Sequence, residues 1–144
     1  MPRLNTSIQW LLFLICIAPI SAQGQSERGS QKWRSLFDGK TMQNWKKTNY
    51  GGEGDVQVTK GQILMEFGYS MSGVTYTGEA LPKTNYEIRV DAIKLDGNDF
   101  FCGMTFPVAN SYCSFIVGGW GGAVVGLSSL DGLDASENET TRYM

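Results

Sequence analysis

The chain has 144 residues, of which 18 are glycine and 12% are aromatic, a composition typical of a chain that buries a core. Its formal net charge of -2 and the lack of any basic cluster argue against binding to nucleic acid or to an anionic membrane surface. Histidine is absent, so acid–base chemistry near neutral pH would depend on carboxylates, lysine or tyrosine.

The first 22 residues have the pattern of a cleavable secretory signal. Arg3 provides a positive start, Trp10 to Ile20 form an apolar run, and Ser21-Ala22 are small residues suited to signal peptidase. As a helix, the apolar run reaches roughly half of the ~30 Å hydrocarbon core, so a transmembrane anchor is less favoured. A lipid anchor on Cys16 is less favoured still. We predict cleavage after Ala22 and export to the periplasm or the extracellular space, with no membrane attachment afterwards.

The rest of the chain is predicted to be a polar linker over residues 23–34 and one all-β domain over residues 35–144. No segment keeps a helical period, and short apolar or alternating runs are separated by glycine-containing turns such as Lys60-Gly61 and Asp96-Gly97-Asn98. This spacing is typical of a β-sandwich. The predicted strands are Leu36-Phe37, Val56–Thr59, Gln62–Phe67, Val74–Ala80, Tyr86–Leu95, Asp99–Phe106, Ser111–Gly118 and Ala123–Leu127.

The longest predicted strand, Tyr86–Leu95, has two distinct faces. Its apolar face contains Tyr86, Ile88, Val90 and Ala92. Its other face contains a ladder of alternating charge: Glu87, Arg89 and Asp91. The ladder is compatible with a solvated sheet face of weak charge pairs, and also with a polar sheet face that lines a sugar cleft. In the second case Arg89 would donate hydrogen bonds to sugar oxygens, and Glu87 and Asp91 would contact the substrate.

Two cysteines remain after removal of the signal, and both lie in one predicted hairpin. A four-residue loop, Pro107–Asn110, would place Met104 opposite Cys113 and leave Cys102 diagonal to it. At a separation of ~7–8 Å the pair exceeds comfortable disulfide geometry. Buried free thiols are therefore favoured, and a disulfide stays open because an exported compartment permits one.

Three stretches of the sequence resemble a known family. They are Ser35-Leu36-Phe37-Asp38-Gly39-Lys40 followed by Trp45, the hairpin Val58–Leu64, and Asn85–Val90. Together they resemble the 3-keto-disaccharide hydrolase family. The resemblance covers Ser35 to the C-terminus and implies a concanavalin A-like jelly-roll that acts on glycosides in exported proteins.

The chain departs from the family pattern at two places. Where many members have an Asn-Ser-Gly-Ile/Val segment, this sequence has Asn98-Asp99-Phe100-Phe101-Cys102-Gly103. Family domains are also longer, so the jelly-roll is expected to be incomplete, with its C-terminal strands missing. Such a sandwich would leave a sheet edge and part of its core uncovered.

The segment Gly118-Gly119-Trp120-Gly121-Gly122 is the first candidate binding element. Glycines on both sides would allow Trp120 to present its flat indole to a sugar ring. The alternative is that Trp120 folds back and fills the sandwich core. A phosphate-binding loop is disfavoured, because no GxGxxG motif precedes a helix and no Walker lysine is present.

An acidic segment, Ser129–Thr140, is the second candidate. Its carboxylates are Asp131, Asp134, Glu137 and Glu139. Ser136 and Glu139 have the spacing of a helix capping box, with the remaining acids solvated. The alternatives are a catalytic or sugar-binding loop, or a Ca²⁺ site, although the spacing matches no EF-hand. Asn138-Glu139-Thr140 also fits an N-glycosylation acceptor.

The resemblance implies a substrate oxidised at C3, whose ketone acidifies the neighbouring C2 proton. A carboxylate base would remove this proton, the leaving sugar would depart by elimination, and water would add afterwards. Candidate bases are Asp131, Asp134 and Glu137, and Arg89 is the candidate that polarises the ketone. A carboxylate-bound metal is an alternative polariser, and the sequence specifies no cofactor.

Three hypotheses about function therefore remain open. The chain is a hydrolase or lyase of oxidised glycosides, a non-catalytic carbohydrate-binding module that uses Trp120 and the polar sheet face, or an inactive fragment. Carbohydrate is the predicted partner in the first two hypotheses, and the oligomeric state is not specified.

Overall fold

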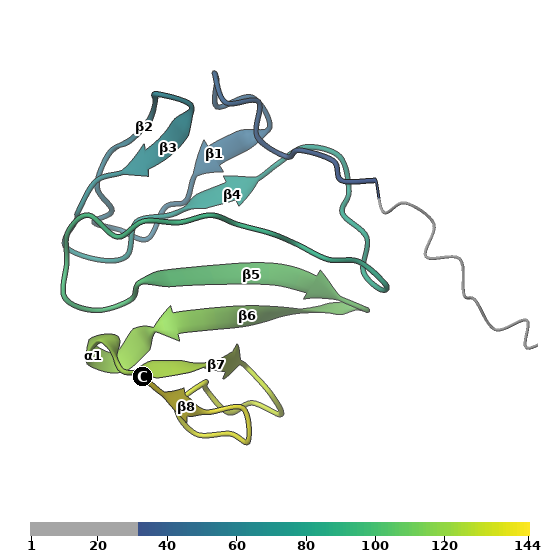
Figure 1. Cartoon of the computed structure of the whole chain (residues 1–144), viewed down its shortest axis with the longest axis vertical. Coiled ribbons are helices and arrows are strands. Elements are labelled where there is room, and N and C mark those ends of the chain that lie inside the picture. The colour runs from purple at the N-terminus through teal and green to yellow at the C-terminus, as the bar shows by residue number, and fades with distance from the viewer. Residues whose placement is uncertain (1–31) are drawn as a thin grey trace, which may run out of the picture. The chain divides into compact units, whose positions relative to one another are not determined.

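The computed structural model describes residues 32–144, of which Ser35–Met144 form one compact unit (Figure 1). The predicted signal peptide and residues 23–31 of the predicted linker lie outside the described residues. The compact unit consists of antiparallel β-strands with almost no helix, so the all-β prediction is confirmed. Within residues 32–144, no helix is long and apolar enough to cross a bilayer.

The strands of this unit pair in three antiparallel groups. β1 pairs with β4, β2 pairs with β3, and β5, β6, β7 and β8 follow one another in a four-stranded sheet (Figure 1). The bounds of the elements are β1 (Trp45–Lys47), β2 (Val56–Thr59), β3 (Gln62–Met65), β4 (Val74–Tyr76), β5 (Cys102–Val108), β6 (Ser111–Gly118), α1 (Gly119–Gly122), β7 (Val124–Ser128) and β8 (Arg142–Tyr143).

The predicted hairpin around Lys60-Gly61 is confirmed. β2 and β3 pair with Thr59 opposite Gln62, so only Lys60 and Gly61 lie in the turn. Both turn residues have positive φ, 49° and 78°, as a type I′ turn requires. The right-handed twist of the two strands favours this turn type.

The N-terminal signature, which is the stretch of residues 35–40 together with Trp45, has structural roles in this fold. One oxygen of Asp38 accepts hydrogen bonds from the backbone N–H groups of Lys40 and Thr41, at 2.7 and 2.8 Å, and the other accepts from the Thr41 hydroxyl. Trp45 donates its indole N–H to Leu36 O at 2.8 Å and packs edge-on against Tyr76. No strand forms at the predicted position, residues 36–37, and the first strand is β1 instead.

The long strand predicted over residues 86–95 does not form. This segment runs alongside β5 (Figure 1), but no backbone hydrogen bond joins residues 86–95 to β5 in the described chain. It is fixed near its start by Ala109 N–H bonding Lys83 O at 3.0 Å and by Tyr86 donating its hydroxyl to Pro107 O. At its far end Lys94 donates to Asp99 O at 2.7 Å. The alternation of apolar residues is therefore a guide to an extended backbone, but it does not show that the segment pairs with a neighbouring strand.

The turn that connects β5 and β6 is shorter than predicted. Val108 lies opposite Ser111, so the connection has two residues and the predicted four-residue loop is wrong. Pro107 belongs to β5, with its carbonyl directed away from β6 toward Tyr86. Proline is tolerated there because its missing N–H falls on the side of β5 that β6 does not use.

This register separates the two cysteines further than predicted. Cys102 lies opposite Val117 and Cys113 lies opposite Phe106, so the thiols are four positions apart along the ladder, about 13 Å. A disulfide is out of reach at this separation. Both thiols are free, as favoured from the sequence, although they are half-buried and not fully buried. Burial raises the pKa of the Cys102 thiol, which keeps it protonated and poorly nucleophilic.

The outer edge of β7 is closed by side chains as well as by a strand. β8 pairs with Val124 and Val125 only. Further along β7, the backbone N–H of Leu127 donates to Thr140 Oγ1 at 2.9 Å, and Leu127 O accepts from Asn138 Nδ2 at 2.8 Å. These two side chains thus replace the next backbone partner and satisfy the exposed strand edge.

The best-buried apolar side chains lie at this part of the sheet. Val124 in β7 is 4% exposed, and Ala135 in the loop between β7 and β8 is 0% exposed. Gly126 permits the contact, because a β-carbon there would lie 2.9 Å from Ala135 O. The loop between β7 and β8 is therefore packed against β7.

We predict that Asp38→Asn reduces the loss of stability in acid. The Thr41 hydroxyl and the N–H groups of Thr41 and Lys40 lower the pKa of Asp38 from 3.8 to about 2. Its stabilisation is therefore present above pH 3.8 and is lost as the pH falls toward about 2. Thermal unfolding measured at about pH 5 and about pH 2 should show a smaller decrease in the variant than in the wild type. The exposed Asp131→Asn is the control, and an equal decrease in wild type and Asp38→Asn would contradict this role.

We also predict that Asn138→Ala lowers the free energy of unfolding by about 1–3 kcal/mol, because it leaves Leu127 O at the β7 edge without its donor and removes one donor each from Leu133 O and Asp134 O in the following loop. Urea denaturation measures the change. Glu139→Ala is the matched control in the same turn, since its side chain is exposed, and it should alter stability by less than about 0.5 kcal/mol. Equal effects of the two substitutions would show that Asn138 does not close the edge.

Candidate functional site

The chain reverses between β6 and β7 through a left-handed turn that contains Trp120. β6 ends at Gly118, with φ of 66°, and the single turn α1 follows. Trp120 (φ 51°, ψ 60°) and Gly121 (φ 77°, ψ 20°) are both left-handed. This conformation is natural for Gly121 but uncommon for a large side chain such as tryptophan, so other contacts must hold it.

Asp99 and Phe100 supply these contacts from the loop before β5. Asp99 Oδ1 accepts a hydrogen bond from the backbone N–H of Gly121 at 2.9 Å. The ring of Phe100 lies 5.9 Å from the ring of Trp120, centroid to centroid, with the planes tilted by 51°. Gly119 allows this close packing, because a β-carbon there would lie 3.0 Å from Phe100 Cε1.

The indole of Trp120 faces solvent in this arrangement. Trp120 is 44% exposed, so it does not fold back to fill the core. Asp99 is exposed beside it, and its Oδ2 atom takes part in no hydrogen bond within residues 32–144. An aromatic face and a carboxylate oxygen are thus available together at the turn.

The acidic loop between β7 and β8 holds the three candidate bases in solvent. Asp131, Asp134 and Glu137 are all exposed. Leu130 and Leu133 exchange backbone hydrogen bonds at 3.0 and 2.8 Å, which fixes Asp131 in a tight turn with φ of 51°. The three side chains share one loop, and no hydrogen bond or ion pair links them within the described chain.

The helical turn that the Ser136–Glu139 spacing predicts does not form. Residues 134–141 make two successive turns, closed by Glu137 N–H to Asp134 O and by Thr141 N–H to Asn138 O. Asn138 Nδ2, the atom that a glycan would modify, donates instead to the carbonyls of Leu127, Leu133 and Asp134. The edge-closing role of Asn138 therefore prevails over the capping box, and glycosylation of the folded domain would require breaking these bonds.

The charged residues of segment 86–95 lie next to β5, away from the acidic loop. Arg89 Nη2 pairs with Asp91 Oδ1 at 3.2 Å, and the two side chains are 73% and 84% exposed. Glu87 is exposed on the same segment. Nothing in residues 32–144 connects Arg89 by hydrogen bond or ion pair to Asp131, Asp134 or Glu137.

The cavities beneath segment 86–95 are apolar in character. One, of about 390 Å³, includes Val90, Cys102 and Phe115 in its lining. A second, of about 420 Å³, shares Met104 and Phe115 with the first. Of the predicted site residues only Asp91 contributes to these linings. Residues 32–144 contain no group of three or more acidic, cysteine or histidine side chains that would hold a metal ion.

Comparison with known proteins gave no match. No family model, no curated protein and no solved structure is significantly similar to this chain.

The two residues that position Trp120 were not predicted as site residues. Asp99 and Phe100 were assigned to a strand, and the sequence shows them only as a departure from the family pattern. Their role depends on a contact across 22 positions of sequence, from Asp99 to Gly121. A sequence signal for these two residues does exist. It is a carboxylate just before one strand combined with a glycine-flanked tryptophan just after the partner strand.

We predict that Trp120→Ala and Trp45→Ala differ strongly in their effect on stability. Trp45 is half-buried, packs on Tyr76 and bonds Leu36 O, so its loss should lower the free energy of unfolding by about 2–3 kcal/mol. Trp120 is half-exposed, and its loss should cost less than about 1 kcal/mol. Urea denaturation of both variants measures the difference. A cost for Trp120→Ala as large as that for Trp45→Ala would show that the indole serves the core.

Proposed function

We propose that this domain binds carbohydrate outside the cytoplasm, and that the Trp120 turn is its sugar-binding surface. The observation that carries the proposal is the exposed indole of Trp120 held next to the Asp99 carboxylate. The C–H groups of a sugar ring pack against an aromatic face, and its hydroxyls donate to a carboxylate oxygen. Because the turn is fixed by Asp99 and Phe100, little conformational entropy is lost on binding.

The concanavalin A-like jelly-roll belongs to the same proposal. It is supported by the antiparallel pairing of the strands in residues 32–144 and by the pairing of β1 with β4, which are not consecutive in sequence, as Greek-key connections require. The resemblance to the 3-keto-disaccharide hydrolase family also supports it, since Asp38 and Trp45 of the signature stabilise the start of the domain.

Hydrolysis or elimination of 3-keto-glycosides is the second candidate function. The observation in its favour is that Asp131, Asp134 and Glu137 are all accessible to a substrate. The reaction also needs a group that polarises the ketone, and Arg89 is paired with Asp91 beside β5, away from these acids. We therefore place binding first. Release of glucose from a 3-keto-disaccharide, lost in Asp131→Asn or Glu137→Gln, would reverse this order.

The proposal predicts that the mature chain is retarded in native gels that contain a neutral polysaccharide. The test panel is β-1,3-glucan, β-1,4-xylan, β-1,4-mannan and soluble starch. Trp120→Ala should abolish the retardation because it removes the stacking face. Tyr112→Ala is the matched control: Tyr112 is 70% exposed and lies at the other end of β6, about 20 Å along the strand from Gly118, where the Trp120 turn begins. Absence of retardation in every gel, or equal retardation of wild type and Trp120→Ala, would refute the proposal.

A further inference from the structure

A second group of exposed aromatic side chains lies close to the loop of residues 96–100, which also holds the Trp120 turn. Phe67 and Tyr69 follow β3 and are 72% and 105% exposed. Exposed apolar residues are common singly, whereas exposed aromatic side chains that gather in one patch can mark an interaction site. The loop of residues 96–100 connects them to the Trp120 turn. Asp99 of this loop bonds Gly121, and a β-carbon at Gly97 would lie 3.7 Å from the ring of Phe67.

The backbone that carries Phe67 and Tyr69 is locked against the loop before β2. Tyr69 N–H donates to Gly52 O at 2.8 Å, and Gly54 N–H donates to Ser72 Oγ at 2.9 Å. The two loops cross so closely that a β-carbon on Gly68 would clash with the Gly52 carbonyl. Any side chain other than hydrogen at this crossing would force the loops apart.

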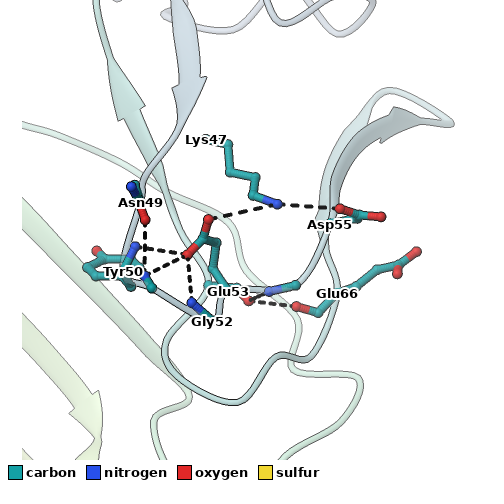
Figure 2. Close-up of polar contacts among 10 residues, drawn as sticks. Lys47, Asn49, Tyr50, Gly52, Glu53, Asp55 and Glu66 are labelled. Atoms are coloured by element: carbon teal, nitrogen blue, oxygen red, sulfur yellow. Dashed lines mark hydrogen bonds and ion pairs between the residues drawn. The ribbon is translucent and has the colours of Figure 1, made fainter.

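Glu53 fixes the other side of this crossing (Figure 2). Its Oε2 atom accepts hydrogen bonds from the backbone N–H groups of Tyr50, Gly51 and Gly52, at 2.9, 2.9 and 3.2 Å. Hydrogen bonds from the backbone N–H of Glu53 itself, then of Gly52 and Tyr50, lower the pKa of its carboxyl. The carboxylate therefore stays charged and holds Gly52, the acceptor of Tyr69, in place.

The charges around this crossing favour a neutral partner. Lys47 contacts both Glu53, at 3.9 Å, and Asp55, at 3.4 Å (Figure 2). Asp96 and Asp99 lie on the connecting loop, where Lys94 is a second cation and donates to Asp99 O at 2.7 Å, so carboxylates still outnumber cations. An excess of carboxylates disfavours nucleic acid, anionic lipid and acidic glycans, whereas neutral sugars can donate hydroxyl hydrogen bonds to them.

We propose that Phe67 and Tyr69 form a second sugar-stacking subsite, so that the domain binds a neutral oligosaccharide chain across residues 96–100 and not a single sugar. This inference rests on the proposed sugar binding at Trp120. One end of the chain stacks on Trp120, the loop of residues 96–100 contacts the middle, and the other end stacks on Phe67 and Tyr69. Glu53 is a positioning residue, because it acts on the ligand only through the loop that fixes Tyr69.

The test is calorimetric titration of the mature chain with the di- to hexasaccharides of the four panel polysaccharides. Wild type should bind the hexasaccharide at least about tenfold more tightly than the disaccharide, since only the longer chain reaches both subsites. The double variant Phe67→Ala/Tyr69→Ala should bind both lengths with the affinity of wild type for the disaccharide. Phe67→Tyr/Tyr69→Phe keeps both rings and should retain the length dependence. Tyr112→Ala controls for loss of an exposed ring elsewhere.

The outcomes separate this inference from the proposed function. If Trp120→Ala abolishes binding while the double alanine variant keeps the length dependence, the second subsite is wrong and sugar binding stands. If wild type binds disaccharide and hexasaccharide equally, the second subsite is likewise overturned. If wild type binds no oligosaccharide, both proposals fall. A double alanine variant that changes only the sedimentation coefficient would assign the patch to self-association and overturn the inference.

Discussion

The hydrogen bond from Gly121 N–H to Asp99 Oδ1 is the contact on which the proposed surface depends. It joins the loop before β5 to the turn after β6 and holds Trp120 in a left-handed conformation that tryptophan rarely adopts. Without this hydrogen bond, only the ring contact with Phe100 would hold the exposed indole in place. The same loop passes close to the ring of Phe67, since a β-carbon at Gly97 would lie 3.7 Å from it.

The local elements of the fold were largely predictable, and the pairings between distant elements were not. Lys60-Gly61 specifies a hairpin by itself, because two residues with positive φ define its turn. The β5–β6 register was missed because Pro107 was taken as a loop residue, whereas it occupies the strand edge that needs no N–H. Alternation over residues 86–95 predicts extended backbone, yet ladder hydrogen bonds depend on a partner's position, which periodicity does not contain.

The turn of the candidate site could be predicted from the sequence, but the contacts that hold it could not, because they join residues that are far apart in the chain. Glycines around Trp120 correctly indicated a turn that can present an indole, since their freedom is local. Asp99 was not recognised, because its partner Gly121 is 22 residues away and local patterns do not show such a contact. The acidic loop shows the limit of motif spacing. Ser136 and Glu139 fit a capping box, but Asn138 bonds Leu127 O at the edge of β7 and the carbonyls of Leu133 and Asp134 in the loop, and these bonds determine the backbone instead.

The central claim is that the Trp120 indole itself contacts sugar, and NMR of the uniformly ¹⁵N-labelled mature chain tests it most directly. During titration with the panel polysaccharides, the Trp120 Nε1–H and Gly121 N–H signals should shift together, while the Trp45 Nε1–H, which is bonded to Leu36 O, stays in place. A titration that shifts other signals and leaves Trp120 and Gly121 unchanged would contradict the account.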